Sequence, residues 1–206
     1  MSEEIAKYKT IASATTGDFR DRGSKFLAYA YPVVSASAVK EKIQALKKEH
    51  PKAVHYCYAY RIGTNGTQFR AVDDGEPSGS AGKPILGQID SMGLTNVMVA
   101  VVRYFGGTLL GVPGLINAYK TATNLALENA PTAEKWIEKL TEINFDYPAM
   151  GEVLYLLKQA ESNIYKQDLQ LFCAVTAGIP KVNYDGIVKK LSEIRGVSLK
   201  VAEQEI

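Results

Sequence analysis

Most side chains that could do chemistry lie in two glycine-rich stretches, and the first spans residues 73–84. It combines three carboxylates, two hydroxyls, glycines and a lysine in a segment too polar for a core. Its glycines let backbone N–H groups approach an anion, and a helix starting at Lys83-Pro84 would add partial positive charge. The sequence therefore predicts an anion-binding loop, with turn capping by the acids as the alternative. The candidate side chains are Asp73, Asp74, Glu76, Ser78, Ser80 and Lys83.

The second stretch, 103–114, lies between an apolar strand and a helix, where α/β folds place ligands. Arg103 offers a fork that can hold a phosphate, and Tyr104 offers a stacking ring. Gly106 and Gly107 leave the backbone accessible. The alternative is that Arg103 and Tyr104 only pack, with Arg103 forming a salt bridge to Asp73 or Asp74.

Three further sets of residues are weaker candidates. The basic residues Arg20, Arg22 and Lys25 could extend a binding groove, although such an edge is usually only solvated. Alternation along a strand places His55 and Cys57 on one face, where the histidine could serve as base to a cysteine nucleophile, but a lone strand histidine is usually structural. The acids of the first stretch could hold Mg²⁺ together with substrate phosphates, whereas no metal site is expected from protein ligands alone.

The composition is that of a globular chain with room for two domains. Its 206 residues are 46% hydrophobic, and the longest apolar run, 97–102, is too short to cross a bilayer. The start of the chain does not resemble a signal peptide, so we expect a cytoplasmic protein without membrane contact. Cys57 and Cys173 lie in separate apolar runs and should be reduced thiols. Residues 1–135 carry 16 basic against 12 acidic side chains, a mild excess compatible with a polyanion partner.

The elements that must position the two stretches can be read from periodicity and turn signals. Residues 5–14 and 25–33 predict strands with a further extended piece between them, together an antiparallel opening, and residues 35–50 predict a helix that Pro51 ends. Residues 54–62 and 67–72 flank an Asn-Gly turn, which predicts a hairpin. A short helix should run from Lys83 or Pro84 to about Gly93, residues 96–104 should form the central strand, and a helix from about Pro113 should stop at Asn129-Ala130-Pro131.

Beyond Pro131 the glycine clusters end and ordinary elements follow. Residues 136–147, 148–160, 163–182, 184–195 and 197–203 predict a strand, a helix, two strands, a helix and a strand. This is the β-α-β-β-α-β order of ferredoxin-like folds. We therefore expect an α+β protein with domains at 1–131 and 132–206.

Four sequence words together resemble the YigZ/Impact family. They are Arg22 to Phe26, His55 to Tyr60, Asp73 to Leu86 and Arg103 to Gly107, and they occur in the family's order. The resemblance implies an N-terminal domain with the fold of the second domain of ribosomal protein S5. It also implies a ferredoxin-like C-terminal domain that resembles the last domain of elongation factor G.

The resemblance implies a role in translation and no particular reaction. Eukaryotic relatives regulate translation by competing for an activator of a stress-response kinase, with an additional domain that is absent here. For bacterial members, nucleic-acid binding or ribosome association is the usual suggestion. One residue departs from the family pattern, because Asn117 stands where a basic residue is expected, and this shifts anion contact toward Arg103 and Lys83.

These observations favour binding over catalysis. Our first hypothesis is a translation-associated protein that contacts RNA or a ribosomal component through the two stretches plus Arg20, Arg22 and Lys25, without a cofactor. The second is a phosphate-handling or hydrolytic enzyme that uses Asp73, Asp74 and Glu76. The third is a protein-interaction module whose loops dock a partner.

Overall fold

The computed structural model describes residues 6–205, and the contacts within the chain divide them into two compact units. Residues 9–134 form one, called here the N-terminal unit, and residues 6–8 and 135–205 form the other, the C-terminal unit. Residue 5 of the first predicted strand lies outside the described residues. No helix in the described part of the chain is long and apolar enough to span a membrane.

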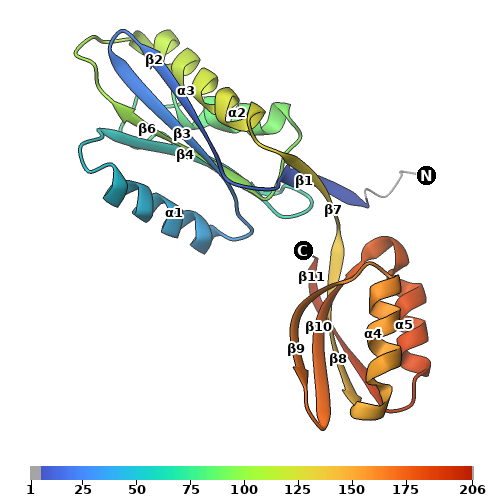
Figure 1. Cartoon of the computed structure of the whole chain (residues 1–206). Coiled ribbons are helices and arrows are strands. Elements are labelled where there is room, and N and C mark those ends of the chain that lie inside the picture. The colour runs from blue at the N-terminus through green and yellow to red at the C-terminus, as the bar shows by residue number, and fades with distance from the viewer. Residues whose placement is uncertain (1–5, 206) are drawn as a thin grey trace, which may run out of the picture. The chain divides into compact units, whose positions relative to one another are not determined.

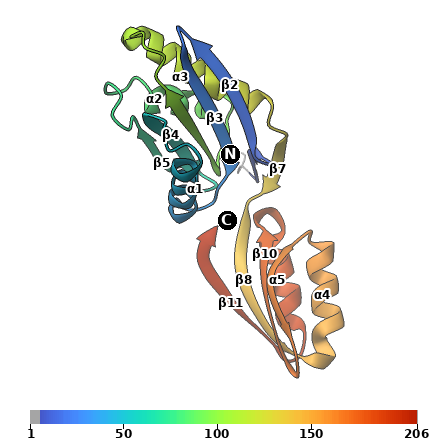
Figure 2. The same ribbon diagram turned by 60° about the vertical axis from the view of Figure 1, so that its left-hand side comes forward.

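The N-terminal unit is built on a five-stranded antiparallel sheet with the order β2-β3-β6-β4-β5. As predicted, β6 lies at its centre, and every residue of this strand before Tyr104 is buried. Figure 2 shows β2 and β5 at opposite edges of the sheet. The strands are β2 (Thr15–Asp21), β3 (Ser24–Pro32), β4 (His55–Ile62), β5 (Gln68–Val72) and β6 (Val97–Tyr104).

Three helices cover the two faces of this sheet. Figure 1 shows α1 (Ala36–Glu49) on one face and α2 (Gly82–Ser91) with α3 (Gly111–Glu128) on the other. The Ser35 hydroxyl caps α1 by accepting a hydrogen bond from the Ala38 N–H at 3.3 Å, as the sequence signal predicts. The predicted hairpin of β4 and β5 and the predicted stop of α3 before Pro131 are also present.

One edge strand lies directly against a helix, and this explains a glycine. A Cβ on Gly17 of β2 would come within 2.6 Å of the Ala126 nitrogen in α3. Any larger residue would push α3 off the sheet, and α3 carries much of the hydrophobic core.

The first strand does not join the five-stranded sheet, contrary to the antiparallel opening expected from the sequence. β1 (Lys7–Ile11) instead pairs with β7 (Thr132–Trp136) in a two-stranded sheet. The division between the units falls within β7, and residues 6–8 are grouped with the later unit. Sequence periodicity detects strands but does not say which ones pair.

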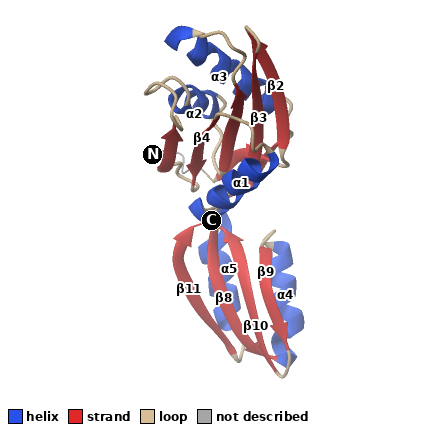
Figure 3. Cartoon of the chain, turned by 90° about the vertical axis from the view of Figure 1, so that its left-hand side faces the viewer, coloured by secondary structure: helices blue, strands red, loops and turns tan. Residues whose placement is uncertain are grey.

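The C-terminal unit has the expected β-α-β-β-α-β order. Its antiparallel sheet has the order β11-β8-β10-β9, and Figure 3 shows α4 and α5 together on one face. The apolar core lies between these helices and the sheet. The elements are β8 (Glu138–Asp146), the 3-10 turn η1 (Tyr147–Ala149), α4 (Met150–Gln159), β9 (Asn163–Leu169), β10 (Phe172–Pro180), η2 (Lys181–Asn183), α5 (Tyr184–Glu193) and β11 (Val197–Glu205).

Candidate functional site

The first loop (residues 73–84) supplies its own anion, the Asp73 carboxylate, at the place where the sequence predicts an external one. The Asp73 carboxylate accepts hydrogen bonds from the backbone N–H groups of Gly79, Ala81 and Gly82 at 2.8–3.0 Å. Burial alone would raise the pKa of Asp73, but these three N–H groups and the charge of Lys83 outweigh it and hold the pKa below its usual value. The start of α2, where the sequence predicts an external anion, is thus occupied by a carboxylate of the protein itself.

Asp74 ties the same loop to β4. Its carboxylate accepts a hydrogen bond from the Tyr56 N–H at 2.7 Å, and its carbonyl lies 2.8 Å from His55 Nδ1. Because a carbonyl can only accept, Nδ1 carries the proton, which leaves Nε2 facing Glu76 at 3.9 Å. Asp74 has a φ of +44° and Gly75 a φ of +90°, and this tight turn lets both groups of Asp74 point at β4.

Glu76 is the buried centre of the site. One carboxylate oxygen accepts from Arg103 Nη1 at 2.6 Å and from the Tyr119 hydroxyl at 2.7 Å. Arg103 is only 5% exposed. Its guanidinium lies 5.4 Å from the ring centre of Phe26 and 5.7 Å from that of Phe105. These contacts lock the first loop to β6 and α3.

This placement corrects the expectation for Arg103. The fork that could hold an external phosphate is directed inward, and its partner is Glu76 rather than Asp73 or Asp74. The buried ion pair explains why an arginine can end an apolar strand, since a buried charge needs an opposite charge beside it.

The arrangement around Cys57 does not suit a nucleophile. His55 and Cys57 do share a face of β4, but the thiol donates a hydrogen bond to the Asp73 carbonyl at 2.9 Å. Its sulfur also lies 3.3 Å from the Tyr119 oxygen. Burial raises the pKa of the Cys57 thiol, so the thiolate that attack requires is disfavoured. Burial likewise raises the pKa of Tyr119.

The remaining candidates of the first loop divide by exposure. Ser80 is buried, and its hydroxyl donates to the Pro77 carbonyl at 2.6 Å. Ser78 and Lys83 face solvent. Within residues 6–205, no group of three or more His, Cys, Asp and Glu side chains is arranged to hold a metal ion.

The second loop (residues 105–110, between β6 and α3) is open by contrast. Residues Phe105 to Leu109 are exposed, and α3 begins at Gly111 with no side-chain cap and no acid in its first turn. The backbone N–H groups at the start of α3 therefore have no carboxylate of the kind that Asp73 supplies to α2. Tyr104, just before the loop, is half-buried with its hydroxyl 3.0 Å from His50 Nδ1.

Glycines pack this loop against the β2–β3 turn. A Cβ on Gly106 would lie 1.9 Å from the Gly23 carbonyl carbon, and the Gly106 N–H donates to the Ser24 hydroxyl at 3.1 Å. The turn itself holds Arg22 at φ +45° and Gly23 at φ +80°, the left-handed pair that a two-residue hairpin requires. Arg22 is thereby fixed, exposed, beside the second loop.

Arg20 and Lys25 extend the cationic surface from this turn. They are paired in register across β2 and β3, and Lys25 is in turn paired with Tyr104. The Asp18 carboxylate lies 3.7 Å from Arg20 and 3.4 Å from Lys25, and so offsets part of their charge. Asn117 is exposed on α3.

One residue of the site was missed by the sequence analysis. Tyr119 was not among the candidates, although a buried tyrosine hydroxyl needs a hydrogen-bond partner. Ser24, fully buried at the start of β3, lies within the sequence word Arg22 to Phe26, but its hydrogen bond with the Gly106 N–H depends on where the second loop lies.

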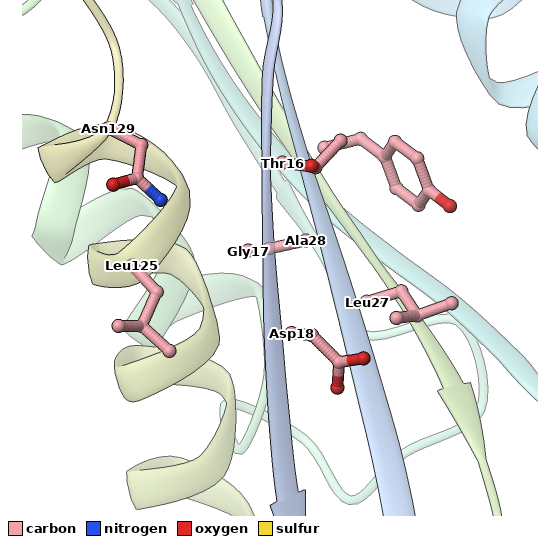
Figure 4. A pocket seen from close by; sticks show the side chains of 8 residues that line it. Thr16, Gly17, Asp18, Leu27, Ala28, Leu125 and Asn129 are labelled. Atoms are coloured by element: carbon pink, nitrogen blue, oxygen red, sulfur yellow. The ribbon is translucent and has the colours of Figure 1, made fainter.

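A separate pocket of about 360 Å³ opens at the edge of the five-stranded sheet. Figure 4 shows Leu125 of α3 and Asn129, directly after α3, reaching it opposite Thr16 and Asp18 of β2. None of its lining residues belongs to the two loops. The lining consists of Thr16, Gly17, Asp18, Leu27, Ala28, Tyr29, Leu125 and Asn129.

Comparison with known proteins places both loops inside a recognised domain. The family model of the Impact N-terminal domain matches residues 22–127. The chain is 33% identical to IMPACT family member YigZ of Escherichia coli over 86% of this chain and 88% of that protein. It is 34% identical to YvyE of Bacillus subtilis, with 76% and 72% covered. It is 36% identical to Protein IMPACT of Rattus norvegicus, but this match spans 52% of the chain and 35% of the relative.

Solved structures agree with the fold. The crystal structure of a hypothetical protein superposes with a TM-score of 0.75 at 29% identity, covering 98% of this chain and 100% of that one. The two-domain translational regulator Yih1 is 30% identical over 59% of this chain and 47% of that protein, with a TM-score of 0.36. The latter superposition is too poor to add to the description of the fold.

Proposed function

The chain belongs to the Impact family, and on that premise we propose that it is a translation-associated binding protein that contacts RNA or a ribosomal component. The part that concerns translation rests on the family, whose eukaryotic members regulate translation. The part that concerns binding rests on the geometry of the second loop and the β2–β3 turn. We place the contact there, with Arg20, Arg22 and Lys25 facing the ligand.

One observation carries this proposal: the turn that exposes Arg22 packs through Gly23 on Gly106 of the second loop, and this loop leads into the uncapped start of α3. Phosphate groups bind well to arginine and lysine side chains and to backbone N–H groups at the start of a helix. Lys83 of the first loop faces solvent and can add a further contact. Binding of this kind requires neither metal nor cofactor.

The enzymatic alternative has less support. Asp73 caps α2, Asp74 holds β4, and Glu76 is paired with Arg103, so each carboxylate of the first loop already has a structural partner. A general acid or base needs to reach a substrate proton, and none of these three is placed to do so without breaking its present contacts.

We also propose the finer fold assignments that the family resemblance implies. The N-terminal unit would have the fold of the second domain of ribosomal protein S5, and the C-terminal unit would be ferredoxin-like, resembling the last domain of elongation factor G. The β-α-β-β-α-β order of the C-terminal unit supports the second assignment.

We propose the cytoplasm as the place where the protein acts. The cysteines Cys57 and Cys173 are free and buried, and free thiols suit the reducing cytoplasm.

The test measures binding of the full chain to a structured ribosomal RNA fragment. Fluorescence anisotropy reports the affinity at KCl concentrations from about 50 to 200 mM. We expect retention that weakens steeply with salt. Arg22→Asn keeps a residue that tolerates positive φ while removing the charge. It should reduce the slope of log affinity against log salt concentration by about one. The combined change Arg20→Ala, Arg22→Asn and Lys25→Ala should weaken binding by about tenfold or more.

Lys158→Ala is the matched control, because it removes one exposed positive charge from α4 in the C-terminal unit. It should leave the affinity almost unchanged. Absence of RNA binding at low salt would remove the proposal. Equal losses of RNA affinity in the control and the triple variant would show that the contact does not lie at the β2–β3 turn.

A further inference from the structure

The second loop and the start of α3 expose a row of large apolar side chains, called here the apolar ridge. It consists of Phe105, Leu109, Val112 and Ile116, and Leu109 is 82% exposed. Val112 and Ile116 are four residues apart on α3 and therefore lie on the same side of the helix. Isolated exposed apolar residues are common, but four along one continuous segment are characteristic of an interaction surface.

The ridge is held in a fixed shape. Leu110, directly after the most exposed member, is buried in the core. A Cβ on Gly114 would lie 3.0 Å from the Leu110 Cβ, so the first turn of α3 closes tightly over that anchor. The Gly106–Gly23 contact fixes the other end. A preformed ridge loses little conformational entropy when a partner covers it.

Positive groups outnumber acids around the ridge, with Asp21 as the acid that stands beside Arg22 at the end of β2. Arg22 lies beside Gly106, and Lys120 is exposed on α3 one turn beyond Ile116. The first turn of α3 contains no acid, and its N-terminal end carries the positive end of the helix dipole. The first acidic residue along α3 is Glu128, near its far end.

We propose that the apolar ridge docks an acidic amphipathic segment of a partner protein, with its apolar side chains on Leu109, Val112 and Ile116 and its carboxylates toward Arg22 and the start of α3. Aliphatic side chains are best buried against other aliphatic groups, whereas nucleic acid offers phosphates and stacking faces. A second copy of the chain fits poorly, because two ridges face to face would bring like charges and two positive helix ends together. The inference extends the proposed function without depending on RNA binding.

The test uses a fluorescein-labelled 16-residue helical peptide with leucines at helical spacing on one face and glutamates on the other. Two relatives of this probe isolate its features, one with lysines for the glutamates and one with serines for the leucines. We expect the acidic amphipathic peptide to bind the full chain about tenfold more tightly than either relative. The NMR shift changes it causes should centre on residues 105–116 and Arg22.

Variants of the protein test the same proposal by changing the apolar ridge in place of the peptide. Leu109→Ser with Ile116→Ser should weaken peptide binding by about tenfold or more, and Ile116→Ser alone, on α3 outside the second loop, should weaken peptide binding while leaving RNA retention unchanged. Val34→Ser, at another exposed apolar position in the same unit, should leave peptide binding unchanged. Equal binding of all three peptides, or loss of RNA rather than peptide binding in the ridge variant, would overturn the proposal. Failure of the two claims can be told apart, because wild type that retains no RNA would remove the proposed function, whereas the comparison of the three peptides needs no RNA.

Discussion

The two glycine-rich loops differ in where their polar groups point. In the first, Asp74 and Glu76 bind other parts of the N-terminal unit, Asp73 caps the start of α2 within the loop, and Ser78 and Lys83 are the polar side chains that face solvent. In the second, the side chains from Phe105 to Leu109 are exposed, and α3 starts without a cap. Two loops that share a richness in glycine therefore serve opposite purposes, since one joins elements within the unit and the other is presented to the outside.

The difference shows what glycine does in each place. Gly82 lies so close to β5 that a Cβ would be 2.5 Å from the Val72 nitrogen, which lets α2 begin under its own carboxylate cap. Gly106 permits an equally close approach, but to an exposed turn that carries Arg22. Close packing thus closes the first loop and builds the surface of the second.

The largest effect should come from the buried ion pair that belongs to the closed loop. Arg103→Met leaves Glu76 as an unpaired buried charge and should lower the free energy of unfolding by about 3–5 kcal/mol. Urea denaturation of the full chain measures this. The double variant Glu76→Gln with Arg103→Met should recover part of the loss, because no charge is left unpaired. A loss below about 1 kcal/mol would mean that the pair is not as buried as described.

Gly106→Ala should disturb the open loop and its binding together. Its Cβ would meet backbone atoms of Gly23 and Ser24, so the loop must move, at a cost of about 1–3 kcal/mol and with weaker RNA retention. Gly107→Ala is the matched control: its Cβ meets nothing within 4 Å, and only the positive φ of +86° opposes it, at about 1 kcal/mol. Equal loss of RNA retention in both variants would contradict the packing role of Gly106.

Asp73→Asn tests the closed loop through pH. The hydrogen bonds that lower the pKa of Asp73 favour the charged form, so its stabilisation is present above the ordinary value of 3.8 and is lost as the pH falls through the lowered folded-state pKa. Wild type should exceed the variant by about 1–2 kcal/mol at neutral pH. Thermal unfolding at about pH 7 and pH 3 should show that this gap narrows in acid. Asp168→Asn, an exposed position on β9, should show no such gap, and a gap independent of pH would refute the assignment.

The smallest effect is expected for Tyr119→Phe. It removes the hydroxyl that donates to Glu76 but leaves Arg103 in place, so the free energy of unfolding should fall by about 1 kcal/mol in denaturation experiments.

The reactivity of Cys57 tests the closed loop in wild type. The buried Cys57 thiol, whose pKa is raised, should react with a maleimide only after unfolding. Labelling of Cys57 at the rate of an exposed thiol would show that the closed loop opens readily.

Much of the fold could be predicted from the sequence because its signals are local. The hairpin of β4 and β5, the capped start of α1, the central position of β6 and the β-α-β-β-α-β order all follow from turn residues and apolar periodicity. The pairing of β1 with β7 could not be predicted, because strand propensity says nothing about partners distant in sequence.

The sequence by itself determined that two loops rich in glycine and polar residues lie at the ends of strands in the N-terminal unit. Only the tertiary structure decided which of them is closed. Glu76 meets Arg103 and Tyr119 across separations of 27 and 43 residues. These contacts exist because sheet register sets His55, which holds the first loop through Asp74, beside Arg103, while α3 packs against β6. Arg103 is buried and paired with Glu76, whereas Arg22 and the apolar ridge stay exposed. A buried charge must be paired within the protein, but an exposed one is free to bind another molecule.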